Sequence, residues 1–457
     1  MSDQEKQQRN AISPVLHAPF LKRFASIQKN DPEVYSILLA ELERQEYTLG
    51  MIPSENYISP TVLAAAGSLF NNKYAEGYSG KRYYQGNVNI DSVETLAISR
   101  AKKVFGAEHV NVQALSGSAA NMAVYFAMLN PGDTIMGLRL DMGGHLTHGH
   151  SVNFSAKFYK PTQYIVEKDT GLINMDAVRE QAQKERPKML VSGATAYPRI
   201  FNFKKFHEIA EEVGAYSMAD ISHISGLIAG DAHPSPFPFT DVVMTTTHKT
   251  LRGSRGALIM CKEKDRLNTD VSADVKADAK KLSLAQKIDR AVFPGLQGGP
   301  HEHIIAAHAV ALGEALKPSF KIYAQQIVKN AKVLARTLMD QGIKLVSDGT
   351  DNHLILIDLT PFGAGLGMQG AVALEHAGIV VNKNTIPYDP STPFKPSGIR
   401  IGTPCLTTRG MKEEEMKQIG EWIALILKDA ENEPLKQTVK AKVRALCEQF
   451  PFYTHAE

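Results

Sequence analysis

The stretch Asp241-Val-Val-Met-Thr-Thr-Thr-His-Lys249 is a short run of apolar and β-branched residues that ends on a lysine. A second run, Gly214-Ala-Tyr-Ser-Met-Ala-Asp220, ends on an aspartate. Their length and composition predict two buried strands. Each places a polar side chain at the carboxyl end of its strand, which is the edge where α/β sheets bind their ligands. The pair therefore predicts an α/β sheet with Asp220 and Lys249 at one site.

The flanking sequence extends this sheet in both directions. From about residue 73 to 310, helical patterns alternate with short apolar runs, such as 188–191 and 257–260. This alternation predicts a sheet covered by helices on both faces. A smaller α+β unit is expected to follow, with helices at 320–341, 368–377, 412–430 and 433–449 and strands at 353–359 and 379–381. The predicted fold class is α/β, a large domain followed by a small C-terminal one.

The expected organisation of the chain has four parts. Residues 1–30 form a polar N-terminal extension, 31–72 a helical segment opened by Asp31-Pro32, 73–312 the large domain and 313–457 the small domain. The charged stretch 262–290 is expected to be a solvated surface excursion of the large domain.

The composition is that of an ordinary globular protein, and it argues against nucleic acids and membranes as binding partners. The chain has 457 residues, 43% hydrophobic and 22% charged, so a sizeable core is expected. With 51 Lys and Arg against 48 Asp and Glu, the charge balance argues against nucleic acid as a partner. No apolar run approaches the ~18 residues of a membrane helix. Three scattered cysteines and an N-terminus without an apolar stretch predict a cytoplasmic location.

A third segment adds a feature that the two strand ends lack. Ser116-Gly117-Ser118 comes directly before the apolar helical run 119–129, and small residues at a helix N-terminus leave backbone N–H groups free to hold a phosphate. Taken alone, each segment reads as an ordinary strand end or helix cap. An acid, a lysine and a phosphate cradle together are what pyridoxal phosphate requires: the lysine binds it covalently, and the carboxylate keeps its pyridine nitrogen protonated.

Three other patterns are weaker. Gly365-Leu-Gly-Met-Gln-Gly370 fits a dinucleotide fingerprint, but the expected strand ends well before it and no acidic residue follows for a ribose. A glycine-rich strand–helix turn is therefore favoured there. Two groups of histidines lack the spacing or the companions of a metal site, namely His301, His303 and His308, and His145, His148 and His150. No metal site is predicted.

Several longer motifs, in their order along about residues 31–450, resemble the serine hydroxymethyltransferase family. They are Ser54-Glu-Asn-Tyr57, Asn72-Lys-Tyr-Ala-Glu-Gly-Tyr78, Gly80-Lys-Arg-Tyr-Tyr84, Gly143-Gly-His-Leu-Thr-His-Gly149, Thr245-Thr-Thr-His-Lys-Thr-Leu-Arg-Gly-Ser-Arg-Gly256, Phe293-Pro-Gly-Leu-Gln-Gly-Gly-Pro300, Gly349-Thr-Asp-Asn-His353, Val381-Asn-Lys-Asn384 and Ser397-Gly-Ile-Arg-Ile-Gly-Thr-Pro404. The resemblance implies a fold-type-I pyridoxal-phosphate transferase, whose large domain has a mixed, mostly parallel seven-stranded sheet. It also implies a homodimer with shared active sites, with tetramers left open, and tetrahydrofolate as co-substrate.

The resemblance assigns cofactor roles to particular positions. Lys249 matches the lysine that binds the cofactor, Asp220 the partner of its pyridine nitrogen, and His145 the imidazole stacked on its ring. The other matching positions are Ser116, Gly117 and Ser118 at the phosphate, Thr195 and His223 near the ring oxygen, and Tyr74 and Gly299, which in the family come from the partner subunit. His248, beside the lysine, matches the catalytic residue that governs the choice of substrate and reaction. Thr195 stands where the family generally has Ser.

The same comparison assigns substrate roles. Arg400 matches the group that binds the amino-acid carboxylate, a task suited to a planar two-pronged donor, and Glu76 matches the acid that moves a proton during cleavage. Ser54 and Tyr84 match further substrate contacts. The positions that match folate contacts are Leu140, Gly144, Leu146, Asn384, Thr392, Pro393 and Phe394.

The implied reaction moves the hydroxymethyl carbon of serine to tetrahydrofolate, giving glycine and 5,10-methylenetetrahydrofolate. Two alternatives stay open at this point. One is a relative with the same cofactor, such as an α-methylserine hydroxymethyltransferase or a threonine-type aldolase or transaldolase. The other is a catalytically silent binding protein, against which the intact Lys249, Asp220, Glu76 and Arg400 argue. Asp141-Met142, beside the implied folate site, departs from the pair that the family generally has there.

Overall fold

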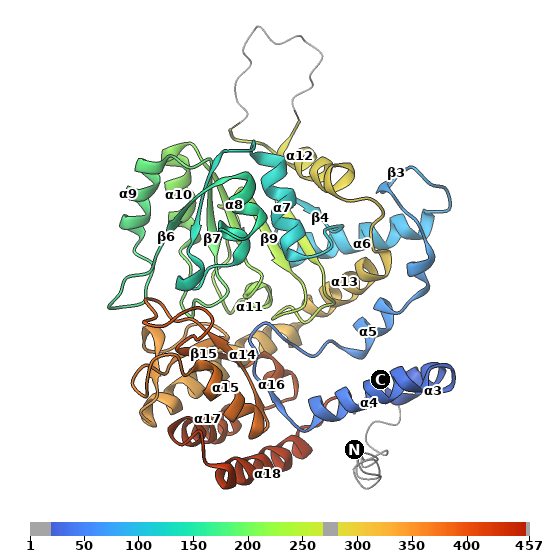
Figure 1. Ribbon diagram of the computed structural model, residues 1–457. Coiled ribbons are helices and arrows are strands. Elements are labelled where there is room, and N and C mark those ends of the chain that lie inside the picture. The colour runs from blue at the N-terminus through green and yellow to red at the C-terminus, as the bar shows by residue number, and fades with distance from the viewer. Residues whose placement is uncertain (1–19, 268–281, 454–457) are drawn as a thin grey trace, which may run out of the picture.

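The computed structural model describes residues 20–267 and 282–453 (Figure 1). Its large domain contains a seven-stranded sheet in the order β4-β10-β9-β8-β7-β5-β6. The strands are β4 (His109–Asn111), β5 (Thr134–Leu138), β6 (Lys160–Tyr164), β7 (Met189–Gly193), β8 (Tyr216–Asp220), β9 (Val242–Thr246) and β10 (Ala257–Cys261). The five strands from β9 to β6 are parallel, and β10 runs antiparallel to both of its neighbours. The expected mixed, mostly parallel sheet is confirmed.

Both faces of this sheet are covered, which explains why the strands β7, β8, β9 and β10 in its interior are buried along their whole length, whereas the edge strand β6 is partly exposed. In β9, Val243 faces one core cluster while Val242 and Met244 face another, as the two-residue period of a strand requires. One face packs against α6 (Val88–Phe105), α9 (Met175–Glu185), α10 (Phe203–Val213), α11 (Ser225–Ala229) and α13 (Glu302–Ala315). The other packs against α7 (Gly117–Met128), α8 (Phe154–Phe158) and α12 (Leu284–Arg290).

The small domain has its own sheet and core. Its four-stranded antiparallel sheet has the order β11-β12-β15-β14, formed by β11 (Lys344–Leu345), β12 (Leu354–Asp358), β14 (Asn382–Asn384) and β15 (Gly398–Gly402). Its helices are α14 (Pro318–Asp340), α15 (Gly367–His376), α16 (Pro404–Thr408), α17 (Glu413–Lys428) and α18 (Glu433–Gln449). The helices expected at 320–341, 368–377, 412–430 and 433–449 are therefore confirmed to within a few residues.

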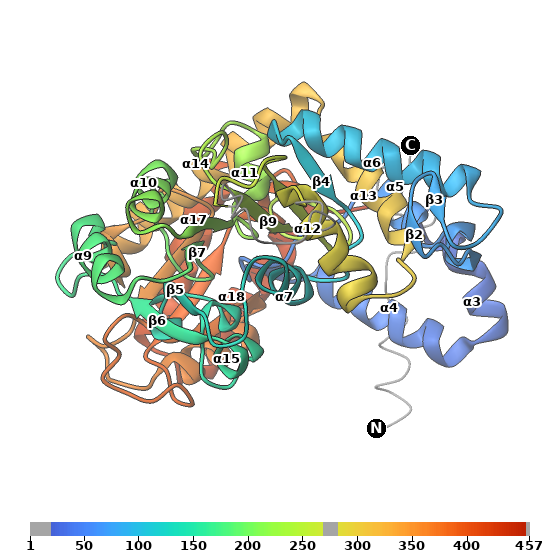
Figure 2. The same ribbon diagram turned by 90° about the horizontal axis from the view of Figure 1, so that it is seen from above.

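The helices at the start of the N-terminal segment lie to one side of both domains (Figures 1 and 2). Asp31 accepts a hydrogen bond from the N–H of Val34 at 3.0 Å and so caps α4 (Pro32–Glu46), as its position before a proline predicts. The segment continues through β1 (Leu49–Gly50), which pairs with β13 (Ile379–Val380) of the small domain, and then α5 (Pro60–Ala66), β2 (Gly77–Tyr78) and β3 (Lys81–Arg82). A short helix, α3 (Ala25–Asn30), precedes α4.

Two sequence expectations can be compared with this fold in detail. The excursion expected over 262–290 is wrong for its last part, because 284–290 form α12, which buries Leu284 and Ile288 in the core; residues 268–281 lie outside the described residues. The strand–helix turn expected at 365–370 is confirmed: a Cβ at Gly367 would lie 2.4 Å from the carbonyl oxygen of Gly398, so glycine allows α15 to approach β15 closely. None of the helices in the described ranges is long and apolar enough to cross a membrane.

Candidate active site

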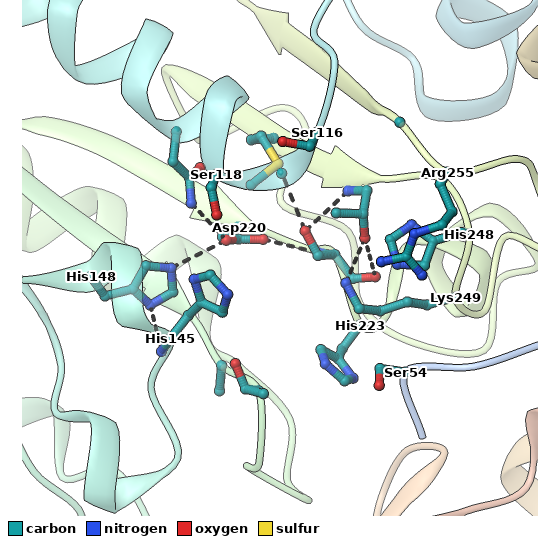
Figure 3. A pocket seen from close by; sticks show the side chains of 18 of the residues that line it. Ser54, Ser116, Ser118, His145, His148, Asp220, His223, His248, Lys249 and Arg255 are labelled. Atoms are coloured by element: carbon teal, nitrogen blue, oxygen red, sulfur yellow. Dashed lines mark hydrogen bonds and ion pairs between the residues drawn. The ribbon is translucent and has the colours of Figure 1, made fainter. Parts of the chain in front are cut away.

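Asp220 and Lys249 meet at the carboxyl edge of the large sheet, in a cavity of about 590 Å³ (Figure 3). Asp220 is the last residue of β8, and Lys249 follows the neighbouring parallel strand β9. Of the residues that the sequence singles out, this cavity is lined by Ser54, Ser116, Gly117, Ser118, His145, Thr195, Asp220, His223, His248, Lys249 and Arg400. The first ten come from the N-terminal segment and the large domain, and Arg400 comes from β15 of the small domain.

The carboxylate of Asp220 is held by three donors. Oδ2 accepts from Asn121 Nδ2 at 3.1 Å and from His148 Nε2 at 3.2 Å, and Oδ1 accepts from the N–H of Ser222 at 3.1 Å. Burial by itself would raise the pKa of Asp220, but the hydrogen bond and field of His148, with His145 and Ser222, lower it below its ordinary value. Asp220 is therefore ionised inside the protein and can stabilise a positive charge placed beside it.

The environment of Lys249, in contrast, favours the uncharged form of its amine. Its Nζ donates to Thr246 Oγ1 at 2.7 Å, and the side chain is almost completely buried. Burial, together with the positive charges of Arg400 and Arg255, lowers the pKa of Lys249 to about 8, although Asp220 acts in the other direction. A lysine with this pKa has about a tenth of its amine unprotonated at pH 7, far more than an ordinary lysine, and attack on a carbonyl needs this free amine.

The N-terminus of α7 faces the same cavity. Ser116 is the residue that precedes the helix, and its hydroxyl makes no capping hydrogen bond. The first N–H groups of a helix have no partner within it, and the helix dipole favours an anion there. Gly117 allows the close packing of this turn, because a Cβ there would lie 2.7 Å from Thr246 Cγ2. Ser116 to Ser118 thus form a cradle of small residues at a positive helix end.

Two histidines that line the cavity, His145 and His248, are uncharged near neutrality. Burial, with a contribution from His148, lowers the pKa of His145 to about 4, and burial with the charge of Lys249 lowers that of His248 to about 3. Nδ1 of His145 accepts from the N–H of Thr147 at 3.2 Å, which orients its ring. His223 lies against His353 of the small domain, with Nδ1 and Nε2 of the two rings 3.2 Å apart.

Arg400 presents a guanidinium to the cavity with part of its donor capacity unused. Nε donates to Asn382 Oδ1 at 3.2 Å and Nη1 to the carbonyl oxygen of Thr195 at 2.7 Å. Within the described residues Nη2 has no hydrogen-bond partner. Burial lowers the pKa of Arg400 to about 10, but the group remains a cation at neutral pH. A buried cation with a free donor is a site for a small carboxylate.

Four of the expected site residues form a separate cluster and, within the described residues, do not line this cavity. Tyr74 OH donates to Glu76 Oε1 at 3.3 Å, and the rings of Tyr74 and Tyr84 have centroids 5.0 Å apart. Gly299 packs against the ring of Tyr74, since a Cβ at Gly299 would be 3.2 Å from Tyr74 Cζ. The tyrosines are largely exposed, at 55% for Tyr74 and 44% for Tyr84. We call Tyr74, Glu76, Tyr84 and Gly299 the tyrosine cluster.

The expected folate contacts lie outside the cavity as well. Leu140 begins a short 3₁₀ turn, Leu140–Met142, and Gly144 and Leu146 flank His145. Asn384 ends β14 and donates to the carbonyl oxygen of Thr385 at 2.6 Å. Phe394 of the segment Thr392, Pro393 and Phe394 is 87% exposed. Asp141, the unusual residue of this region, pairs with Arg139 at 2.6 Å on the surface.

The sequence reasoning missed several side chains that line the cavity, among them Glu55, Asn121, His148, Ser222, Thr246 and Arg255. The sequence pattern groups His148 only with its neighbouring histidines, which lack the companions of a metal site. In the structure Nδ1 of His148 accepts from the N–H of His145 at 3.3 Å, so the ring proton is on Nε2, facing Asp220. Two of these residues could have been found from the sequence, because Ser222 follows Asp220 by two residues and Thr246 precedes Lys249 by three.

This set of groups fits pyridoxal phosphate. A lysine with a lowered pKa, an ionised aspartate, an uncharged imidazole and a helix N-terminus surround one cavity, and each has the charge that the corresponding part of the cofactor requires. Among residues 20–267 and 282–453, no group of three or more His, Cys, Asp or Glu side chains is placed to hold a metal ion.

Two comparisons with known proteins extend over most of the chain. A family model described as serine hydroxymethyltransferase matches residues 27–423. A curated protein named serine hydroxymethyltransferase, from Koribacter versatilis (strain Ellin345), is 52% identical over 429 residues, which cover 94% of this chain and 96% of that protein. The similarity therefore includes both domains and all of the cavity residues.

Proposed function

The chain belongs to the serine hydroxymethyltransferase family, and we propose that it is a pyridoxal-phosphate-dependent transferase that moves the hydroxymethyl carbon of serine to tetrahydrofolate. The observation that carries this proposal is the pairing, in one cavity, of a Lys249 amine whose pKa is lowered to about 8 with an Asp220 carboxylate that is held ionised. The identity to a serine hydroxymethyltransferase does not favour the aldolase or α-methylserine alternatives.

The residues that would hold the cofactor each perform one task. Lys249 would bind its aldehyde carbon, Asp220 would pair with its pyridine nitrogen, and Ser116 to Ser118 would hold its phosphate at the start of α7. His145, uncharged at neutral pH, offers a flat surface beside the ring. When bound, pyridoxal phosphate supplies an electron sink for negative charge at the α-carbon of the amino acid.

Arg400 is the proposed anchor of the substrate carboxylate. Its Nη2 donor and its position on a rigid central strand of the small-domain sheet, β15, would hold the amino acid in one orientation. Ser54, which lines the cavity from the N-terminal segment, supplies a hydroxyl for a second contact. Fixing the carboxylate orients the bond that breaks, and such orientation is a large part of what a binding site contributes to rate.

Glu76 is the proposed acid–base group for the serine hydroxyl. A carboxyl can take the hydroxyl proton as the carbon–carbon bond breaks, but Glu76 lies in the tyrosine cluster rather than in the cavity of its own chain. We therefore propose a homodimer in which the tyrosine cluster of one subunit completes the cavity of the other. Exposed apolar side chains on the same segment, Leu69, Tyr83 and Val88, support such an interface.

The acceptor site is proposed on the side of His145 that carries Leu140, Gly144 and Leu146. Leu146 is 41% exposed and supplies apolar area for a flat ring system, and Asn384 and the segment 392–394 are proposed to complete it. The cytoplasm is the proposed location, because the three cysteines are all free and buried, as suits a reducing compartment.

The deciding experiment measures product formation from serine with and without tetrahydrofolate by the purified protein reconstituted with pyridoxal phosphate. Glycine formation that depends on tetrahydrofolate is expected. Equal rates without it would favour the aldolase alternative, and turnover of α-methylserine in preference to serine would favour the other. In a parallel assay, borohydride reduction should attach the cofactor to the peptide that contains Lys249, and Lys249→Ala should abolish this. Attachment at another lysine would contradict the site.

A further inference from the structure

Asn56 lies directly behind the cavity and uses every hydrogen-bonding position of its side-chain amide. Nδ2 donates to the carbonyl oxygen of Lys249 at 3.0 Å and to Tyr323 Oη at 2.7 Å. Oδ1 accepts from the N–H of Tyr57 at 2.9 Å and from Thr408 Oγ1 at 2.7 Å. The partners belong to segments far apart in the sequence, so this one side chain joins the N-terminal segment, the large domain, α14 and α16.

The orientation of the amide follows from the chemistry of its partners. A backbone carbonyl can only accept and a backbone N–H can only donate, so Nδ2 must face Lys249 and Oδ1 must face Tyr57. The two hydroxyls then complete a ring. Tyr323 accepts from Asn56 and donates to Thr408 across 3.0 Å, and Thr408 donates back to Asn56. If the amide were flipped, its oxygen would face the carbonyl oxygen of Lys249 and its NH2 group would face the N–H of Tyr57. The ring of hydrogen bonds therefore has a single arrangement.

The turn that carries Lys249 is held from two sides. The carbonyl oxygen of Lys249 accepts from the N–H of Arg252 at 3.0 Å as well as from Asn56, so both of its lone pairs are used. Arg252 adopts a φ of +60°, in the left-handed region, and its guanidinium lies 4.6 Å from the ring centroid of Tyr323. The residues that define this turn therefore contact the same tyrosine that Asn56 binds.

We propose that Asn56 is a positioning residue that fixes the Lys249 turn relative to the N-terminal segment that lines the cavity and to the small domain. Its neighbours Ser54 and Glu55 line the same cavity as Lys249. Its partner Thr408 ends α16, the helix that follows directly after the strand bearing Arg400. Asn56 thus sets the separation between the amine that binds the cofactor and the guanidinium that binds the substrate carboxylate.

Loss of this link has a consequence that can be measured on Lys249 itself. A loosened turn admits water to a buried amine, so the pKa of Lys249 should rise from about 8 toward the ordinary lysine value. Competitive labelling with acetic anhydride across a pH series, followed by mass spectrometry, titrates this one amine in the cofactor-free full-length chain. The exposed Lys204 serves as the internal reference.

The matched control is Asn330→Ala. Asn330 is a buried asparagine that links the same two helices by donating to Thr407 Oγ1 and to the carbonyl oxygen of Met411, both at 2.9 Å, but it does not touch the Lys249 turn. Both substitutions remove the same atoms and should lower the melting temperature. Only Asn56→Ala should move the labelling midpoint of Lys249 upward, by about one pH unit.

A labelling midpoint unchanged in Asn56→Ala, or shifted equally in Asn330→Ala, would overturn the proposal. If Asn56→Ala does not fold, the same comparison is made with Asn56→Leu, which keeps the volume, and with Thr408→Val, which opens the hydrogen-bond ring. A kinetic measurement, which rests on the proposed function, should show kcat for serine reduced about tenfold or more in Asn56→Ala but not in Asn330→Ala. If the wild-type protein does not convert serine, the proposed function fails while the labelling result still decides the role of Asn56.

Discussion

Nε2 of His148 lies 3.2 Å from Oδ2 of Asp220, and both side chains are almost completely buried. The ring is locked in one tautomer because its Nδ1 accepts from the N–H of His145. An ionised carboxylate inside a protein is stable only when donors surround it, so His148 is a main reason that Asp220 keeps its charge.

The first prediction concerns that contact. His148→Ala should raise the pKa of Asp220, because burial is then less opposed, and weaken pyridoxal phosphate binding. A hydrogen bond to a charged group contributes roughly 1.5–3 kcal/mol, so the dissociation constant should rise about tenfold to a hundredfold. Equilibrium dialysis of the cofactor measures this. His150→Ala, in the same segment but away from Asp220, is the control, and equal losses in both variants would contradict the assigned role.

Arg400→Lys should raise the KM for serine by about tenfold or more. Lysine keeps the charge but cannot reproduce the planar donor set that leaves Nη2 free while Nε and Nη1 are held by the protein. Steady-state kinetics with varied serine give the value, and tetrahydrofolate saturation should change much less. An unchanged KM for serine would indicate that another group binds the carboxylate.

Glu76→Gln should separate two activities. The substitution is nearly isosteric, so cofactor binding should persist, but folate-dependent cleavage of serine should fall on the order of 10²-fold because an acid–base group is lost. Cleavage of allo-threonine, a bulkier β-hydroxy acid that needs no folate, should fall less. Both rates are measured on one preparation. Equal losses would make Glu76 a scaffold residue.

The proposed sharing of each active site between two subunits predicts that activity recovers when two inactive variants are mixed. Lys249→Ala and Glu76→Gln subunits, exchanged and mixed in equal amounts, should form heterodimers in which one of the two cavities has both groups intact. Random pairing restores about a quarter of the wild-type activity. Neither homodimer has an intact cavity, so each parent serves as its own control. If mixing restores nothing although heterodimers form, the tyrosine cluster does not serve the partner subunit.

The buried carboxyl of Glu302 is expected to make the free energy of unfolding depend on pH. Its carboxyl is buried 3.8 Å from Arg82, which also binds Glu94 and Asp91, and burial raises the pKa of Glu302 from 4.5 to about 8. A raised pKa means that the folded protein prefers the protonated form, so the contribution of Glu302 is complete below 4.5 and is lost as the pH rises toward 8.

Glu302→Gln copies the protonated form, so it should raise the melting temperature above pH 8 and leave it unchanged below pH 4.5. The expected gain is roughly 1 °C for each kcal/mol recovered, because the entropy of unfolding grows with the length of the chain. Calorimetry across the pH range measures it, with Glu208→Gln, in an exposed ion pair with Lys204, as the control. A gain that is the same at every pH would show that the carboxyl does not titrate as described.

The sequence by itself determined the sheet and the two groups at its edge. Asp220 and Lys249 could be placed because each ends a short apolar run, and strand formation depends on such local patterns. Ser116 to Ser118 could be placed for a similar reason, since a helix beginning is marked by its own residues. Arg400 and the tyrosine cluster were reached only through family motifs, because no local rule links them to a strand end in another domain.

Only the tertiary structure decided how these groups are supported. His148 contacts Asp220 although His148 lies in the segment after β5 and Asp220 ends β8. Asn56 binds Lys249, Tyr323 and Thr408, which lie far from it along the chain. Glu302 is neutral because it is buried beside an arginine that two other carboxylates already occupy. Such contacts form only when several loops pack together and exclude water from the groups between them. Local sequence carries the propensity of each segment, but the desolvation and pairing of a charge exist only when distant segments have come together.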